Sequence, residues 1–364
     1  MINSREGYTI LSRAEQSRAE QSRAEQSRAE HYSIDFTKFI FAFFVVAIHT
    51  KPFINADDVR FLSFYNTLVG LAVPFFFIAS GYLITENQRI IKQNTLTKRV
   101  NRHLVKLVKY YMIWSFIYLP LAIYGYHVNG DNAIRAVILY VRNLFLQGEH
   151  YFSWPLWYLL SSIYAFLVLY FLLKKKIVST SALVGIIIFF IFLANVTNIL
   201  VADMHSLSGI VAFAAKVLQK TVGTGRIFTG VYFVLVGVLI ARYKEYLSGI
   251  NSVILVSTFV VCFVVVALFA TPLVGIVMHG IFFVIIEKAT WKRNNGVYLR
   301  RCSTVIYYIH MLFVFVYTLC VGMEFRYGVS GFVMTSICAM MVAVLVNLKK
   351  VRNCKLVIML FGKM

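Results

Sequence analysis

Charged residues are scarce in this chain of 364 residues, at 14% of the sequence, and acidic residues are the rarer kind, with 15 Asp and Glu against 36 Lys and Arg. Hydrophobic residues make up 60% of the chain and aromatic residues 16%. A soluble domain of this length has too little interior to bury so much apolar surface. The composition therefore excludes an ordinary soluble protein and predicts a polytopic membrane protein.

Cysteine is also scarce, and the five cysteines show none of the paired spacings typical of a metal site or a disulfide framework. We therefore expect no metal. The first 30 residues are polar, which excludes a cleavable signal peptide, so the first apolar helix must direct insertion. The basic residues behind the net charge of +21 lie in short clusters between apolar runs, as membrane orientation requires. We expect membrane lipids, and no nucleic acid, as partners.

Ten apolar segments have the length and composition of membrane-spanning helices. They cover residues 34–51, 62–85, 105–126, 154–173, 179–200, 224–241, 251–270, 272–287, 303–322 and 330–348. The predicted fold class is therefore an all-α polytopic membrane bundle of about ten transmembrane helices. Residues 132–146 predict an amphipathic helix at the membrane interface, because Arg135 and Arg142 interrupt an apolar pattern. Residues 205–222 are ambiguous and compatible with a re-entrant segment.

The basic residues also predict the orientation of the bundle. Loops after even-numbered spans, together with the C-terminus, contain 22 Lys and Arg, against eight on the opposite side. Since basic loops favour the cytoplasm, we expect both termini there. The chain then divides into a polar N-terminal segment (1–31), a membrane domain (32–350) and a basic cytoplasmic tail (351–364).

The first span places three ionisable residues in one membrane helix, SIDFTKFIFAFFVVAIHT. Asp35 and Lys38 lie at its start and His49 near its far end. An Asp or Lys at the bilayer centre costs roughly 2.5–3.5 kcal/mol on insertion scales, so such residues mark functional sites. The fourteen residues from Asp35 to His49 span about 21 Å along a helix. We therefore expect a titratable imidazole deep toward the outer side.

Six segments, in order along the chain, form a family pattern: IDFTKFIFAFFVVAIHT, VPFFFIASGYLI, KRVNRHLVKLVKYY, WPLWYLL, GTGRIFTGVYFVLVGVLI and STVIYYIH. From Tyr32 onward, the sequence resembles the acyltransferase family 3 of membrane acyltransferases. That family includes bacterial O-acetyltransferases that act on surface polysaccharides. The chain departs from the family at Lys38, where Arg is usual, and at Pro155, where a His is common. Lys38 keeps the charge but loses the bidentate fork of an arginine.

The resemblance implies that His49 is the catalytic general base, with Asp35 either supporting the catalytic site or serving only the scaffold. It also implies an acyl-CoA donor, with acetyl-CoA expected. Arg99 and Arg102 share one helix face, and guanidinium groups suit phosphate oxygens, so we expect them to bind this donor together with Lys38. The alternative for the arginine pair is membrane orientation alone.

Four further residues are candidates for substrate binding or support. Arg226, Tyr308 and His310 belong to the family motifs, and a packing role for His310 is an equal alternative. Trp157 belongs to an aromatic segment that first indicates an interfacial belt, although a sugar would also stack on such rings.

The expected function is transfer of an acyl group, most simply acetyl, to a hydroxyl of a cell-envelope glycan, such as a lipopolysaccharide or a lipid-linked sugar. The location expected is the bacterial cytoplasmic (inner) membrane. Direct transfer and an acyl-histidine intermediate are both compatible with the sequence. One alternative is a transporter or flippase of a lipid-linked sugar. Another is a sensing or uptake domain like those attached to membrane serine racemases, although no racemase domain is expected after residue 364.

Residues 12–30 form a perfect repeat, SRAEQSRAEQSRAEQSRAE. Three copies of the pentanucleotide AGCAG translate as Ser-Arg-Ala-Glu-Gln, and His31, whose codons begin with CA, continues the tract. A five-base unit shifts the reading frame whenever one copy is gained or lost, so we expect phase-variable expression. The alternative is a charged segment, disordered or briefly helical, with no such role.

We predict that sibling colonies differ in the number of AGCAG units and that one length in three is in frame. Sequencing the tract across single colonies measures this directly. A chain that starts near His31 with an added Met should keep its activity, because the repeat precedes the family pattern. Synonymous, non-repetitive codons in the gene would contradict the prediction.

Overall fold

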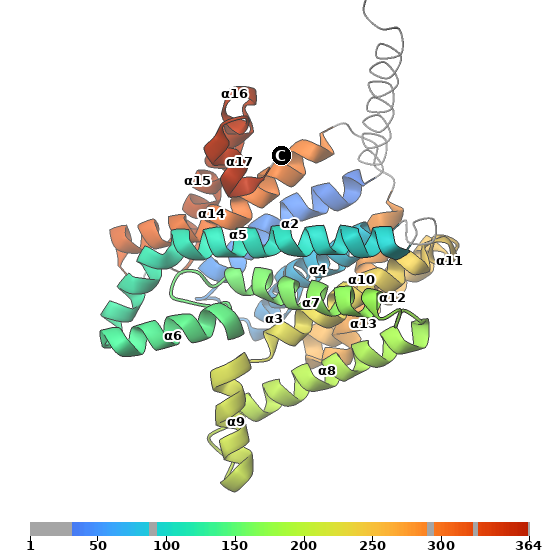
Figure 1. Ribbon diagram of the computed structural model, residues 1–364, viewed down its shortest axis with the longest axis horizontal. Helices are drawn as coiled ribbons and strands as arrows, with labels where there is room; N and C mark the ends of the chain where they lie inside the picture. The colour runs from blue at the N-terminus through green and yellow to red at the C-terminus, as the bar shows by residue number, and fades with distance from the viewer. Residues whose placement is uncertain (1–30, 87–92, 290–294, 323–326, 363–364) are drawn as a thin grey trace, which may run out of the picture.

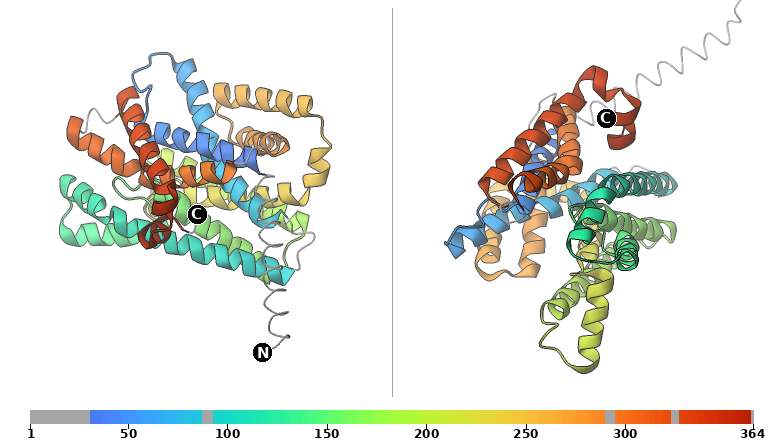
Figure 2. Two further views of the ribbon diagram at one scale, coloured as in Figure 1. Left: turned by 90° about the horizontal axis from the view of Figure 1, so that it is seen from above. Right: turned by 90° about the vertical axis from the view of Figure 1, so that its left-hand side faces the viewer.

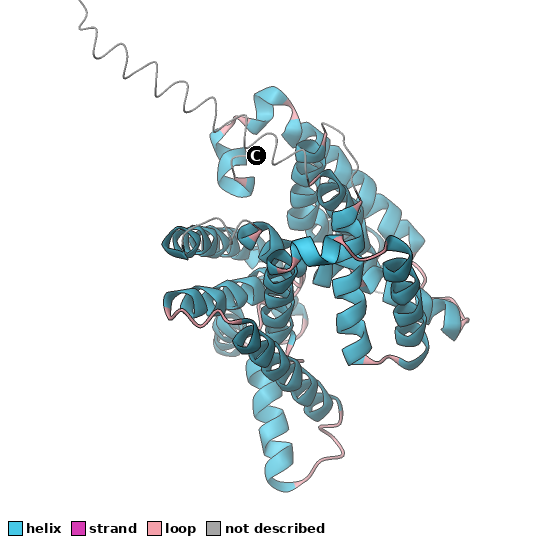
Figure 3. Ribbon diagram, turned by 90° about the vertical axis from the view of Figure 1, so that its right-hand side faces the viewer, coloured by secondary structure: helices cyan, strands magenta, loops and turns pink. Residues whose placement is uncertain are grey.

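The computed structural model describes residues 31–86, 93–289, 295–322 and 327–362, and within these ranges every regular element is a helix (Figure 1, Figure 3). The predicted all-α membrane bundle is therefore confirmed. The SRAEQ repeat, and the phase variation inferred from it, lie outside the described residues.

Each predicted span corresponds to a helix, with the second formed by two helices in succession. These helices are α2 (Tyr32–Thr50), α3 (Val59–Gly70) with α4 (Ala72–Thr85), α5 (Gln93–Val128), α7 (Leu156–Lys174), α8 (Thr180–Ala202), α10 (Arg226–Arg242), α12 (Ser252–Phe269), α13 (Pro272–Lys288), α14 (Gly296–Val321) and α15 (Val329–Asn347). Within the described ranges, eight spans are long and apolar enough to cross a membrane by themselves. A ninth results if α10 is counted with the helix before it, while α13 has only 17 residues.

Shorter helices occupy the connections. The predicted interfacial helix is α6 (Ala133–Leu146), in which no residue is buried. The ambiguous segment forms α9 (Gly209–Val222), which meets α10 at a bend of 66°, as in a broken span or a re-entrant loop. The remaining short helices are α11 (Lys244–Ser248), α16 (Lys349–Arg352) and α17 (Lys355–Phe361). Helix α17 lies against α5, where the Trp114 indole donates to the Leu360 carbonyl at 3.0 Å.

Helix α2 lies inside the bundle, where it packs against α4, α13, α14 and α15. Helices α8 and α9, coloured yellow-green, project from the bundle on the side away from the red C-terminal helices (Figure 1, Figure 2). Only Leu183, Ile187 and Thr197 of α8 are buried. Because α8 contains no ionisable residue, lipid can cover its apolar sides without an electrostatic cost. The ionisable residues of α2 are instead enclosed by its neighbouring helices.

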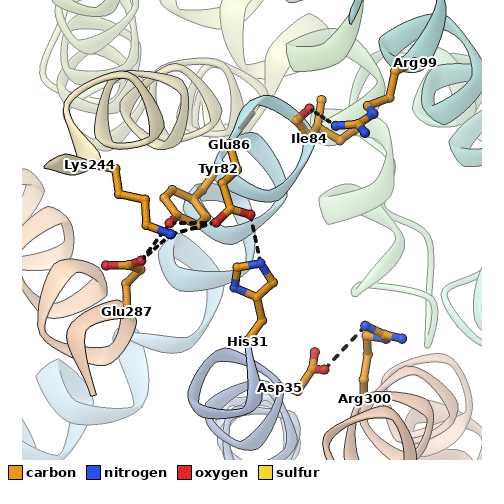
Figure 4. Close-up of polar contacts among 9 residues, drawn as sticks. All are labelled: His31, Asp35, Tyr82, Ile84, Glu86, Arg99, Lys244, Glu287 and Arg300. Carbon is orange, nitrogen blue, oxygen red and sulfur yellow. Dashed lines mark hydrogen bonds and ion pairs between the residues drawn. The ribbon is translucent and has the colours of Figure 1, made fainter. Parts of the chain in front are cut away.

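The inner end of the bundle, defined as the end where α2 and α14 begin, is held by an ion network (Figure 4). Lys244 contacts Glu86 at 2.8 Å and Glu287 at 3.1 Å, and His31 contacts Glu86 at 2.8 Å. Tyr82 donates its hydroxyl to Glu287 at 2.8 Å. Burial disfavours the charged form of Glu86, but hydrogen bonds from His31 and Lys244 outweigh this effect and lower the pKa of Glu86 to about 2. The network joins α2, α4, α11 and α13 at the side that the basic loops predict to be cytoplasmic.

Helices α4 and α10 cross at van der Waals contact through two glycines. A Cβ atom on Gly81 would lie 2.1 Å from the Val234 carbonyl oxygen, and one on Gly237 would lie 2.1 Å from the Ile78 carbonyl oxygen. Both obstructing atoms belong to backbone, which cannot rotate away. Small residues at such crossings let membrane helices approach closely.

We predict that Gly237→Ala lowers the free energy of unfolding by about 1–3 kcal/mol, because the new methyl group forces α4 and α10 apart. Thermal unfolding of the detergent-solubilised protein measures the change. Gly185→Ala on α8 is the matched control, since a Cβ atom there meets nothing within 4 Å. Equal unfolding temperatures for the two variants would show that the crossing is not a tight one.

Candidate active site

A cavity of about 790 Å³ runs along α2 and connects the inner end of the bundle to the outer end. Lys38 lines it near the inner end, and Lys51 lines it thirteen residues later, about 20 Å along the helix. His49 lies between them, close to Lys51. The cavity thus offers a passage from one side of the bundle to an imidazole near the other.

His49 is surrounded by rings. Its imidazole lies parallel to the Trp154 indole, with 6.4 Å between the ring centroids, and 5.4 Å from the His310 ring. In the part of the chain that the structure describes, no side chain or carbonyl hydrogen-bonds to the His49 ring. Its nitrogens are therefore available to a substrate in the cavity, as a general base requires.

His310 lies behind His49 and does not line the cavity. Its Nδ1 atom is 2.8 Å from the Tyr307 carbonyl oxygen and 3.1 Å from that of Ile306. Since a carbonyl oxygen only accepts, Nδ1 carries a proton, and in the neutral ring Nε2 is then the unprotonated nitrogen. This Nε2 atom is buried and has no partner among the described residues. The hydrogen bonds within α14 therefore set the tautomer of the imidazole that packs beside His49.

The outer end of the cavity combines charged and aromatic side chains. Arg226, from the start of α10, forms an ion pair with Glu149 at 2.5 Å and lies over the Trp157 ring at 5.6 Å. Lys51 lies over the Tyr327 ring at 4.8 Å. All five side chains line the cavity. Charged groups beside exposed ring faces suit a polar, ring-shaped ligand such as a sugar.

Tyr308 and its neighbour form the middle of the cavity wall. Tyr308 lines the cavity and stacks on Trp114, with ring centroids 4.7 Å apart. Tyr307 also lines it and donates its hydroxyl to the Pro155 carbonyl at 2.7 Å. This bond joins α14 to the segment before α7, which carries Trp154. The aromatic wall around His49 is therefore supported from a second helix.

The inner end of the cavity is basic. Arg300 lines it together with Lys38, and its Nη1 atom lies 3.4 Å from the Asp35 carboxylate (Figure 4). The Asp35 side chain is only 2% exposed. The structure therefore places Asp35 at Arg300 and about 21 Å along α2 from His49, so its carboxylate serves the inner end.

The structure does not bring Arg99 and Arg102 to the cavity. Arg99 donates to the Ile84 carbonyl at 3.2 Å (Figure 4), and Arg102 is exposed on the same inner part of α5. Neither lines the cavity. Their contact with a donor stays a prediction, and any such contact would be outside the passage.

Sequence reasoning missed several residues of the site. Arg300 was counted only as part of a basic loop that orients the chain, and Glu149 lies in a connection without a family motif. Tyr307 and Trp154 adjoin predicted residues, so the motifs themselves were the signal. Among the described residues, no group of three or more His, Cys, Asp or Glu side chains could hold a metal ion.

The family model for an acyltransferase domain, that of acyltransferase family 3, matches residues 31–348. The chain belongs to this family. It is a multi-pass membrane protein, and the motifs that first suggested the resemblance extend along the same range.

Three racemases are similar to parts of the chain. An amino-acid racemase of Enterococcus faecalis is 27% identical over 206 residues, which are 56% of this chain and 27% of the racemase. A second amino-acid racemase of that species is 29% identical over 39% of this chain and 19% of the racemase. A serine/alanine racemase of Enterococcus gallinarum is 31% identical over 33% of this chain and 17% of the racemase. The matches thus cover about a quarter or less of these relatives. No solved structure is significantly similar.

Proposed function

We propose that the protein transfers an acyl group, acetyl in the simplest case, from cytoplasmic acyl-CoA to a hydroxyl of a cell-envelope glycan. The observation that carries this proposal is the cavity that joins a basic inner end to His49 and continues to an aromatic outer end. The family supplies the reaction class. The predicted orientation puts the inner end in the cytoplasm, where acyl-CoA is found, and the bacterial inner membrane is the location we propose.

The reaction takes place at His49. The acceptor hydroxyl enters from the outer end, beside Trp154 and Trp157, and its oxygen attacks the thioester carbonyl carbon. His49 takes the hydroxyl proton as the new C–O bond forms. The C–S bond then breaks, and the imidazolium returns the proton to the thiolate, so the products are the acylated glycan and CoA with a free thiol.

The surroundings of His49 suit this role. The rings of Trp154 and His310 lie beside the imidazole, and His49 itself lines the cavity. A base of this kind must be positioned within hydrogen-bond reach of the proton that it removes. Arg226 and Glu149 at the outer end would orient polar groups of the acceptor.

A second candidate follows from the racemase matches, the longest of which covers 56% of this chain. On this proposal the bundle senses or takes up a small molecule and transfers no acyl group. Labelled acetyl-CoA distinguishes the two functions. Label that appears in a glycan supports acyl transfer, and uptake of labelled serine into vesicles without label transfer supports the second candidate.

We predict that His49→Ala lowers acyl transfer by at least about 10²-fold, the usual contribution of a positioned base. The assay follows label from acetyl-CoA into envelope glycan at equal membrane abundance of each variant. His205→Ala is the control, because this histidine is exposed in the connection between α8 and α9. A His49→Ala protein with more than a small fraction of wild-type transfer would overturn the assignment.

A further inference from the structure

Positive side chains from three helices converge at the inner end of the cavity. Lys38 of α2 and Arg300 of α14 line the cavity itself. Lys106 of α5 does not line the cavity, but its charge is close enough to Arg300 for the two to repel each other. Asp35 is the carboxylate that contacts this group. Lys38 and Arg300 are thus two positive side chains in the cavity lining, and among the described residues Asp35 is the carboxylate that contacts Arg300, so an anionic ligand would balance the remaining charge.

Asp35 contacts Arg300 through only one of the guanidinium nitrogens. The contact joins one nitrogen, Nη1, to one oxygen, Oδ2, at 3.4 Å. The Arg300 side chain remains 38% exposed, whereas that of Asp35 is 2% exposed. Arg300 lines the cavity, and its guanidinium keeps N–H groups that the contact with Asp35 does not use. A planar fork fixed on one side is well suited to bind phosphate oxygens.

We propose that Arg300, together with Lys38, binds the diphosphate of the acyl-CoA donor at the inner end of the cavity. This inference rests on the proposed function and specifies where its donor is held. Lys106 adds positive charge from α5, outside the cavity lining. The adenosine end of the donor then lies toward the cytoplasm, and the acyl end lies inside the bundle.

The length of the donor's pantetheine arm agrees with the separation of Lys38 and His49 along α2. Lys38 precedes His49 by eleven residues, so the two are separated by about 16 Å along α2. The pantetheine arm has about thirteen bonds from phosphorus to sulfur and spans roughly 15 Å when extended, at the roughly 1.15 Å per bond of an extended peptide. A diphosphate at Lys38 and Arg300 therefore brings the thioester to His49.

The same placement gives Arg99 and Arg102 a separate role. They precede Lys106 by seven and four residues on α5, which puts them further toward the inner surface and outside the cavity. CoA carries a third phosphate, on the 3′ oxygen of its ribose, beyond the diphosphate. We expect the arginine pair to meet that phosphate, while Arg300 meets the diphosphate.

The test compares donors with and without phosphates on the full-length, detergent-purified protein. We expect Arg300→Gln to raise the KM for acetyl-CoA by about 10–100-fold, as the loss of a charge-assisted hydrogen bond does. The KM for acetyl-pantetheine, which has no phosphate, should not change. Arg300→Lys should recover part of the affinity, and Lys109→Gln, which removes an exposed charge from α5, should behave as wild type.

Binding of labelled CoA gives the same comparison without turnover, and thermal unfolding of each variant checks that it is folded. Equal CoA affinity in Arg300→Gln and wild type overturns the inference, as does an equal rise in KM for acetyl-CoA and acetyl-pantetheine. A wild-type protein that transfers no label from acetyl-CoA contradicts the proposed function instead. The two failures are therefore distinguishable.

Dephospho-CoA, which lacks the 3′-phosphate, separates the two basic sites. The double variant Arg99→Ala with Arg102→Ala should bind CoA more weakly and dephospho-CoA as well as wild type does. Arg300→Gln should weaken the binding of both. If Arg300→Gln affects CoA alone, Arg300 contacts the 3′-phosphate and the assignment to the diphosphate is overturned.

Discussion

An ionisable side chain inside a bilayer has to be surrounded by protein or water, and the first helix of this protein carries three of them. Asp35, Lys38 and His49 would each destabilise a helix exposed to lipid. Helix α2 is accordingly enclosed by α4, α13, α14 and α15, and the cavity runs beside it. The same enclosure builds the site, because α14, which packs against α2, also supplies Arg300, Tyr308 and His310.

The same constraint explains the contrast between the centre and the periphery. At the inner end, Glu86 and Glu287 are paired with Lys244, and Glu86 also with His31, so charges that anchor four helices are satisfied by one another. Helix α8 has no ionisable residue and only three buried residues, so its apolar sides are free to face lipid. The central helices thus carry two separate sets of ionisable side chains, the ion network at the inner end and the residues that line the cavity.

The two ends of the cavity differ in character. The inner end presents cations with one buried carboxylate beside them, and the outer end presents an ion pair and indole rings. A long donor with phosphates at one end and a thioester at the other fits the first end, and a sugar fits the second.

The similarity of this chain to parts of three racemases shows that related sequence also occurs in longer proteins of another class. What a site of this kind does depends on its side chains more than on the bundle.

The sequence by itself determined the fold class, because hydrophobic runs of membrane length permit little besides helices, and six motifs in order indicated the family. Asp35, Lys38 and His49 were recognisable because charge is conspicuous in an apolar helix. Only the tertiary structure decided which residues share a site. It placed Arg300 beside Asp35 across 265 positions of sequence, and it brought Arg226 to Glu149 across 77. It also separated Arg99 and Arg102 from the cavity. Spacing along one helix predicts which residues share a face. Contacts between helices depend instead on how their surfaces pack, as at Gly81 and Gly237. A single sequence does not display that packing.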